Sequence, residues 1–154
     1  QTNLKWGSQK DLLQAIPGLE NVNIVRYGVM HRNTFINSPK LLKPTLQLRK
    51  YPNIFFAGQM TGVEGYMESA SSGMMAGINA VRRLQKKNTV TLPPTTMIGA
   101  LSRYIADGSV KDFQPMGANL GILPPLLETI RDKRLKAAAY AERALKDLAG
   151  LNDF

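Results

Sequence analysis

The amino-acid sequence predicts an α/β fold in which a strand leads through a glycine-rich turn into a long helix. Residues 53–57 (NIFFA) form a short apolar run that is typical of a buried strand. Gly58, Gly62 and Gly65 punctuate the turn, and residues 64–85 are then rich in small side chains and methionine. Sites for nucleotide cofactors are commonly built where a strand, a tight turn and a helix follow one another. The same segment therefore indicates where a ligand would bind.

Length and composition narrow the class of protein. The 154 residues, 44% of them hydrophobic, are enough for one domain with its own core. No apolar run is long enough to span a bilayer. The first 16 residues resemble neither a signal peptide nor a transit peptide, so we expect a cytoplasmic protein. A start at Gln1 is typical of a fragment or a processed product. The sequence has no cysteine, which excludes disulfides, thiolate metal sites and cysteine nucleophiles within these residues.

The positive charge is concentrated in the first part of the chain. Residues 1–90 hold 12 Lys and Arg against 4 Asp and Glu, a net charge of +8. Residues 91–154 hold 8 against 7, a net charge of +1. This asymmetry favours contact between the first part and a polyanion, although a solvated basic surface explains it equally well. Composition leaves both interpretations open.

The elements expected before the glycine turn are short. A helix is predicted over residues 9–16, with Ser8 as its N-cap and Pro17-Gly18 as its end. Residues 23–30 (NIVRYGVM) are predicted to be a strand because they are rich in β-branched and aromatic side chains. Residues 46–48 follow a proline and are expected to be an edge strand or an extended segment.

Beyond the glycine turn the chain is predicted to be helical. The Pro93-Pro94 pair marks an expected boundary between a first domain, 1–90, and a helical region, 91–154, that packs on it. Helices are predicted over 96–106 and 126–148, with a loop over 113–125 between them. The last helix should end at Gly150 and bury a stripe formed by Leu127, Ile130, Leu135, Ala138, Ala141, Leu145 and Leu148.

The glycine turn has chemistry suited to a ligand with delocalised negative charge. Glycines let backbone N–H groups approach a ligand closely and adopt positive φ. The helix behind them supplies free N–H donors and roughly half a positive charge. Glu64 and Glu68 would repel a dianionic phosphate, which favours a ligand such as the carbonyl edge of a flavin ring. The simpler interpretation is an ordinary turn before a helix, whose small residues at 70, 73, 77 and 80 only permit close packing.

Residues 27–84 resemble the carboxy-terminal region of a known family. The segments MHRNTFINSP (30–39) and GQMTGVEGYMESA (58–70) are similar to those of the folate- and FAD-dependent tRNA (uracil-5-)-methyltransferases, the TrmFO family. That family is related to the GidA flavoproteins, which carry a similar loop and helix. The resemblance continues through ILPPL at 122–126. It implies the carboxy-terminal part of a Rossmann-like FAD-binding domain followed by a helical tail.

The resemblance also implies an activity. The family makes the T-loop 5-methyluridine of tRNA, with methylenetetrahydrofolate as carbon donor, FAD as cofactor and NAD(P)H as reductant. The family's G-x-G-x-x-G motif and its two catalytic cysteines do not occur in these 154 residues. We therefore expect an inactive fragment that contains no catalytic residue and no metal site. Its expected partner is the amino-terminal part of the same protein, and we expect the fragment alone to be prone to self-association.

Site residues follow from the resemblance in two groups. The flavin side of the FAD site is assigned to Gly58, Gln59, Thr61, Gly62, Val63, Glu64 and Gly65. Contacts to tRNA or substrate are assigned more loosely to His31, Arg32, Asn33, Lys40, Lys43, Arg49 and Lys50. A second basic group, Arg82, Arg83, Lys86 and Lys87, is explained by its place at the carboxy end of the predicted helix, where cations are favourable.

Two other functions remain open at this point. The first is a GidA-type tRNA-modifying flavoprotein. The sequence segments TGVEGY and MHRNTFINSP are more similar to the methyltransferase family and so favour the methyltransferase. The second is a non-catalytic basic RNA-binding module, which the charge permits. An RNA module has no need of the glycine turn ahead of a small-residue helix, so that turn discriminates between the two classes.

Overall fold

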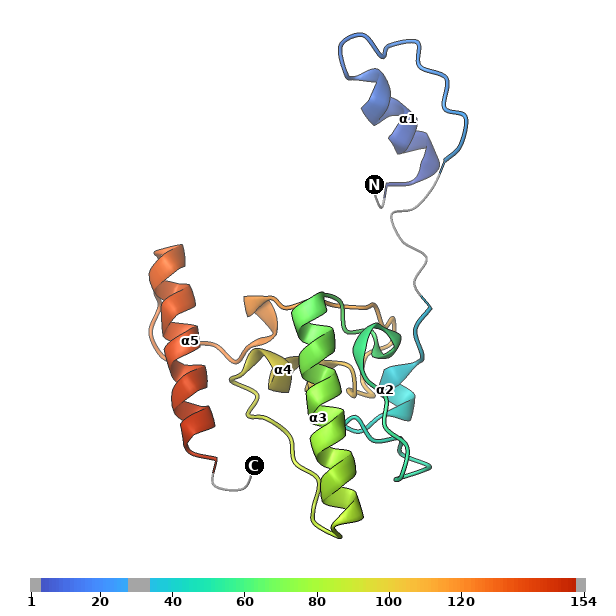
Figure 1. Cartoon of the computed structure of the whole chain (residues 1–154). Helices are drawn as coiled ribbons and strands as arrows, with labels where there is room; N and C mark the ends of the chain where they lie inside the picture. The colour runs from blue at the N-terminus through green and yellow to red at the C-terminus, as the bar shows by residue number, and fades with distance from the viewer. Residues whose placement is uncertain (1–3, 28–33, 152–154) are drawn as a thin grey trace. The chain divides into compact units, whose positions relative to one another are not determined.

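The computed structural model describes residues 4–27 and 34–151, which form two units divided between Thr34 and Phe35 (Figure 1). In the first unit, helix α1 spans Trp6–Gln14. Its N-cap is Lys5 rather than the predicted Ser8, so that prediction is wrong. Gly18, with φ of 90°, lies in the turn that follows the helix, as the Pro17-Gly18 pair predicted.

The predicted strand over residues 23–30 is not formed where the structure describes it. Residues 23–27 have no strand pairing, and residues 28–30 lie outside the described part. Val25 is 96% exposed, so its apolar side chain has no sheet to pack against. Tyr27 instead stacks on Trp6 at 6.3 Å between ring centroids.

The second unit is built from helices and irregular segments. Its elements are α2 (Ser38–Leu41), η1 (Gly58–Thr61), α3 (Tyr66–Leu84), α4 (Met97–Tyr104), η2 (Leu120–Ile122) and α5 (Lys133–Ala149). Helix α3 runs through the middle of this unit, and α4 packs against it (Figure 1). The structure confirms the prediction of a long helix after the glycine turn.

The buried strand predicted at 53–57 is absent, and no strand occurs in residues 4–27 and 34–151. Phe55 forms an isolated antiparallel bridge with Gln47, and Leu48 forms another with Leu42. Ile54 closes a turn onto Tyr51, with its N–H 3.0 Å from the carbonyl oxygen. A strand needs neighbours on both sides to become part of a buried sheet. The described residues supply only single bridges, so the Rossmann-like sheet stays a prediction.

The main core collects residues from both sides of position 90. Leu46, Val63, Met75, Ala76 and Ile105 are buried together. They come from a turn, the glycine segment, α3 and the end of α4, so the second unit is one packed body. A domain boundary near residue 90 stays a prediction.

Helix α4 follows its predicted pattern closely. Thr96 is its N-cap, and the Thr96 hydroxyl accepts a hydrogen bond of 3.1 Å from the Gly99 N–H. Threonine is a favourable N-cap residue, so both the start of this helix and its periodicity are visible in the sequence.

Helix α5 departs from its prediction at the start and on its buried face. It begins at Lys133, because Asp132 accepts hydrogen bonds of 2.9 Å from the N–H groups of Arg134 and Leu135. The predicted apolar stripe is wrong, since Leu135 is 64% and Leu145 67% exposed. Tyr140 is the buried anchor of this helix, in a second small core. Gly150 ends the helix as predicted.

Two kinds of feature are absent from the described part of the chain. Among residues 4–27 and 34–151, no helix combines the length and apolar character needed to cross a bilayer. Within the same residues, no group of three or more His, Cys, Asp or Glu side chains is arranged to hold a metal ion.

Candidate functional site

The glycine turn is a compact loop whose shape depends on positive φ angles. It begins with η1 and continues through Gly62, in the left-handed region with φ of 85° and ψ of 13°. Gly58 and Gly65 also have positive φ, at 69° and 103°. Residues with a Cβ rarely adopt these conformations, which explains the glycines at these positions.

A segment far along the chain holds the loop in place. Val63 forms an isolated parallel bridge with Met116. The Glu64 N–H donates to the Met116 carbonyl at 3.0 Å, and the Met116 N–H donates to the Gly62 carbonyl at 2.9 Å. A Cβ at Gly62 would overlap the ring of Phe113. Gly62 is therefore required both by its backbone angle and by close packing.

The middle of the loop faces the interior. Thr61 is fully buried, and its hydroxyl donates to the Gly58 carbonyl at 2.7 Å. The Ser38 hydroxyl donates to the Thr61 carbonyl at 2.8 Å, and the Gly58 N–H donates to the Ser72 hydroxyl at 2.8 Å. Because Thr61 and Val63 are buried, their side chains hold the loop rather than face solvent.

The accessible part of the loop consists of Gln59, Met60, Glu64 and Gly65, together with the start of α3. Tyr66 is 98% and Met67 77% exposed. Gly65 is the N-cap of α3 and has no side chain to cap it, so the first N–H groups of the helix carry no capping bond. These donors and the positive end of the helix dipole lie beside the exposed loop residues.

Glu68 lies in the first turn of α3 and makes a contact with a distant segment of the chain. Its carboxylate accepts a hydrogen bond of 3.0 Å from the Ala118 N–H. A Cβ at Gly65 would overlap that carboxylate, so Gly65 also permits the Glu68 contact. The hydrogen bond fixes the position of the Glu68 carboxylate but does not remove its charge, so Glu64 and Glu68 both keep negative charge near this helix start.

Four of the seven predicted tRNA residues lie in the described part of the chain, on two segments that are hydrogen-bonded to each other through Arg49 N–H and the Leu41 carbonyl at 2.8 Å. His31, Arg32 and Asn33 lie outside the described residues. Arg49 donates from Nη2 to the Ala106 carbonyl at 3.0 Å, and the Lys50 ammonium lies 5.4 Å from the Tyr51 ring centroid. Lys40 is exposed on α2.

Lys43 has a different environment, because it shares a cavity with cations of the second basic group. This cavity of about 250 Å³, here named the basic pocket, is lined by Lys43, Gln47, Pro52, Arg83, Lys87, Asn88 and Thr89. The sequence assigns Lys43 to one basic group and Arg83 and Lys87 to another, far along the chain. Only the tertiary packing brings them together, and no spacing in the sequence signals it.

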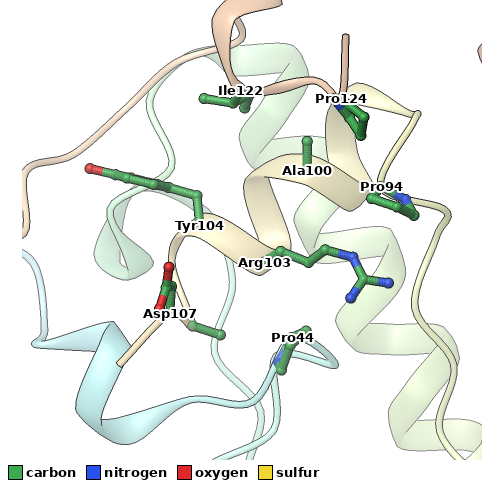
Figure 2. A pocket seen from close by; sticks show the side chains of 9 residues that line it. Pro44, Pro94, Ala100, Arg103, Tyr104, Asp107, Ile122 and Pro124 are labelled. Carbon is green, nitrogen blue, oxygen red and sulfur yellow. The ribbon is translucent and has the colours of Figure 1, made fainter. Parts of the chain in front are cut away.

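A larger open cavity of about 530 Å³ lies along α4 (Figure 2). Arg103, Tyr104 and Asp107 line it together with three prolines, and the Tyr104 hydroxyl donates to the Gln114 carbonyl at 2.8 Å. Hydrogen bonds from the Ser109 hydroxyl and N–H lower the pKa of Asp107 below its ordinary value. Asp107 is therefore a fixed anion at the edge of this cavity.

Comparison with known proteins gives a consistent result. A family model described as glucose inhibited division protein A matches residues 1–88. The chain is 59% identical over 148 residues to a protein of Halalkalibacterium halodurans named methylenetetrahydrofolate--tRNA-(uracil-5-)-methyltransferase TrmFO, and this match covers 96% of the chain and 34% of the relative. Relatives of the same name from Bacillus cytotoxicus and Anoxybacillus flavithermus give the same identity and coverage.

The chain spans about a third of the length of these curated relatives. A solved structure of Aquifex aeolicus GidA aligns with 75% of the chain and 19% of its own length, at 32% identity and a TM-score of 0.48. The family model alone covers more than half of the chain, including the whole glycine turn and α3. The chain therefore belongs to the family of glucose inhibited division protein A.

Proposed function

We propose that this chain is the carboxy-terminal part of a methylenetetrahydrofolate- and FAD-dependent tRNA (uracil-5-)-methyltransferase. The observation that carries the proposal is the 59% identity, over 96% of the chain, to relatives that bear this name. The whole enzyme forms 5-methyluridine in the T-loop of tRNA and uses NAD(P)H as reductant. Because its substrate is tRNA, we expect it in the cytoplasm.

The glycine turn fits a contribution to the flavin side of an FAD site. Gln59, Glu64 and Gly65 are exposed, and the uncapped start of α3 lies next to them. The Gln59 amide offers both donors and an acceptor to a polar cofactor edge. The helix start would stabilise negative charge on the pyrimidine edge of the reduced ring. When bound, FAD supplies the redox chemistry of the carbon transfer.

The remaining assigned residues would support this site from beneath. The buried side chains of Thr61 and Val63 set the path of the loop, and Gly58 and Gly62 provide its turns. Any contact of these four residues with a cofactor would be made by their backbone. Their role is therefore to hold Gln59 and Gly65 in fixed positions.

The rest of the catalytic apparatus must come from outside these 154 residues. The chain has no cysteine and no G-x-G-x-x-G motif, so the nucleophile and the site for the adenosine half of FAD would belong to the preceding part of the enzyme. The same part would provide the strands that complete a Rossmann-like sheet beside residues 53–57. We expect the chain alone to be inactive and to bind FAD poorly.

The proposal is tested by FAD titration with fluorescence quenching, on this chain and on the full-length enzyme. In the full-length enzyme, Gln59→Ala and Glu64→Ala change exposed loop residues without touching the core. Matched controls are Gln85→Ala and Glu128→Ala, which are exposed elsewhere. We expect the loop variants to weaken FAD binding about tenfold, which corresponds to about 1.4 kcal/mol, while the controls match the unchanged enzyme. Unchanged affinity in both loop variants would refute a cofactor role for the turn.

A second candidate is a GidA-type tRNA-modifying flavoprotein that carries out a different reaction. The description of the matching family model favours it. The two are separated by nucleoside analysis of tRNA incubated with the full-length enzyme, FAD, NAD(P)H and labelled methylenetetrahydrofolate. Label in 5-methyluridine supports the methyltransferase, and label in another uridine derivative supports the alternative.

A further inference from the structure

The basic pocket is formed by two segments that are distant in sequence. One wall is the turn around Lys43 and Gln47, where the Lys43 N–H donates to the Gln47 carbonyl at 2.9 Å. The other wall is the end of α3 and the residues after it, 83–89. Both walls belong to the second unit, and the lower end of α3 in Figure 1 marks the position of the second wall.

A fully buried asparagine ties the walls together. Asn79, which is 0% exposed, donates from Nδ2 to the Thr45 carbonyl at 3.1 Å and to the Val90 carbonyl at 2.9 Å. Its Oδ1 accepts from the Val90 N–H at 2.7 Å. One side chain thus fixes the chain on both sides of the pocket. The backbone walls of the pocket are therefore fixed by the fold, and its three cationic side chains, Lys43, Arg83 and Lys87, are exposed at its surface.

The end of α3 adds to this rigidity. Lys86 adopts a left-handed conformation with φ of 59°, and the Lys87 N–H returns to the Arg82 carbonyl at 2.8 Å. This is the Schellman arrangement that closes a helix. It turns the backbone at the helix end, so that Lys87 becomes a lining residue beside Arg83.

The charges of the basic pocket are all of one sign. Lys43, Arg83 and Lys87 are its only ionisable lining residues. In the described part of the chain, none of these three forms an ion pair, and Asn88 and Thr89 add neutral polar groups to the lining. Three exposed cations lining one pocket without a carboxylate make its potential positive, which favours the binding of an anion. A phosphate group has the charge and the acceptor oxygens that this lining suits.

We propose that the basic pocket binds a phosphate of an RNA backbone. The proposal rests on the proposed function in one respect, which is that the RNA is the tRNA substrate. The glycine turn and the basic pocket lie at opposite ends of α3, whose 19 residues rise through roughly 27 Å. An RNA of several nucleotides spans that distance, whereas a single nucleotide at the catalytic end does not. The pocket therefore anchors the substrate backbone at a point remote from the reacting base.

The test uses the FAD-loaded full-length enzyme and a T-arm tRNA transcript. The site variant is Lys43→Gln, Arg83→Gln and Lys87→Gln combined. The control variant is Lys10→Gln, Arg26→Gln and Lys111→Gln combined, which removes the same charge from exposed positions elsewhere. The dissociation constant for tRNA is measured by fluorescence anisotropy across a salt series. FAD content and circular dichroism are recorded for each variant, and single substitutions at the three sites replace the combined variant if it fails to fold.

We expect the site variant to bind tRNA at least tenfold more weakly at low salt than the control. We also expect the slope of log affinity against log salt to fall by about 0.7 to 0.9 for each phosphate that the variant no longer binds. The FAD content should stay unchanged, because the cofactor site lies at the other end of α3. Equal tRNA affinity and equal salt slope in the site and control variants would overturn the proposal.

Two further outcomes separate this inference from the proposed function. If the enzyme binds tRNA through the basic pocket but methylates no uridine, the inference holds and the methyltransferase proposal fails. If the enzyme methylates tRNA while the site variant behaves as the control, the inference alone fails. A third outcome is that inorganic phosphate shifts the nuclear magnetic resonance signals of residues 43 and 87, while the substitutions leave tRNA binding unchanged. The pocket would then bind a free anion, and the proposal of an RNA phosphate would be overturned.

Discussion

Single residues hold this fold by satisfying backbone groups that the irregular segments leave without partners. Asn79 is the clearest example, because one buried amide makes three hydrogen bonds to two segments. Ser38 and Ser72 act in the same way for the glycine turn, by donating to the Thr61 carbonyl and accepting from the Gly58 N–H. Where the described chain forms no strands, such side chains replace the ladder bonds of a sheet.

Asn79→Ala is expected to be strongly destabilising. It removes the donor to both carbonyl groups and leaves the partly buried Val90 N–H without the Asn79 acceptor. The expected loss is about 2 to 3 kcal/mol in the free energy of unfolding, measured by urea denaturation. The control Asn53→Ala changes an exposed turn residue and should stay within about 0.5 kcal/mol. Similar losses in both variants would contradict the bridging role of Asn79.

Asp107 gives a prediction about pH. Its folded pKa is lowered, chiefly by the Ser109 hydroxyl, so the contact stabilises the fold above the unfolded pKa of the carboxyl. That stability is lost as the pH falls through the folded pKa. Ser109→Ala should therefore raise the pKa of Asp107, measured by nuclear magnetic resonance titration of its carboxyl carbon. An unchanged pKa would show that the hydroxyl is not its cause.

At the scale of elements, helix ends decide where the chain changes direction. Thr96 and Asp132 cap α4 and α5 with side-chain oxygens. Gly65 begins α3 without a cap, and Lys86 closes it in a conformation that glycine adopts more readily. The two uncommon ends of α3 are also the two places where ligands are proposed to bind.

Lys86→Gly should stabilise the chain. A lysine in the left-handed conformation carries a steric cost of roughly 1 to 2 kcal/mol, which glycine does not have. Glycine has greater conformational entropy in the unfolded chain, and this offsets part of the gain in stability. The net expectation is a gain of about 0.5 to 1 kcal/mol, measured by urea denaturation. The control Lys87→Gly, outside the left-handed region, should give no gain.

Asp132→Ala should shorten or loosen α5. Loss of its two hydrogen bonds to the first turn is expected to cost about 1 kcal/mol. The measurement is the helical signal in far-ultraviolet circular dichroism together with thermal unfolding. Asp132→Ser retains an N-cap acceptor and should recover most of the loss. A helix signal unaffected by Asp132→Ala would show that Tyr140 packing alone holds α5.

The sequence predicts the helices of this chain better than its other parts. The apolar spacing of α3 and the Thr96 cap of α4 are local signals, and both elements lie where expected. Apolar spacing predicts too early a start for α5, because it continues through residues 126–132, whereas the Asp132 cap marks the true beginning. The strands at 23–30 and 53–57 depend on partner strands, which the described residues do not supply.

The candidate sites divide in the same way. The glycine turn is predictable because positive φ angles leave a mark in the sequence, namely the glycines themselves. Which of its side chains are buried is not predictable, since the contacts of Gly62 and Glu64 with Met116 are long-range. The basic pocket has no sequence signal because Lys43 and Arg83 meet only through the packing that Asn79 supports.

At the scale of the whole molecule, one face of α3 has no partner within the described chain. Ser72, Met75, Ala76 and Asn79 are buried, whereas exposed apolar side chains follow the opposite face. The exposed fractions on that face are 77% for Met67, 58% for Met74, 52% for Val81 and 84% for Leu84. Contiguous apolar surface of this kind usually marks an interface.

The chain alone is therefore expected to self-associate. Analytical ultracentrifugation should show oligomers at micromolar concentration, and Met74→Lys with Val81→Lys should return the chain to a monomer. The control pair, Lys111→Glu with Lys136→Glu, changes charge away from this face and should leave association unchanged. If the chain without substitutions is monomeric, the exposed apolar face of α3 does not drive self-association.

The pairing of Val63 with Met116 also sets a time order for assembly during synthesis. The turn cannot reach its final shape until a loop of more than fifty residues has closed, because Met116 and Ala118 hold Gly62, Glu64 and Glu68. At typical ribosomal speeds of about 5 to 20 residues per second, several seconds separate the emergence of the two segments. In the proposed function, the turn would therefore become able to bind a cofactor only after the segment around Met116 has been synthesised and has paired with it.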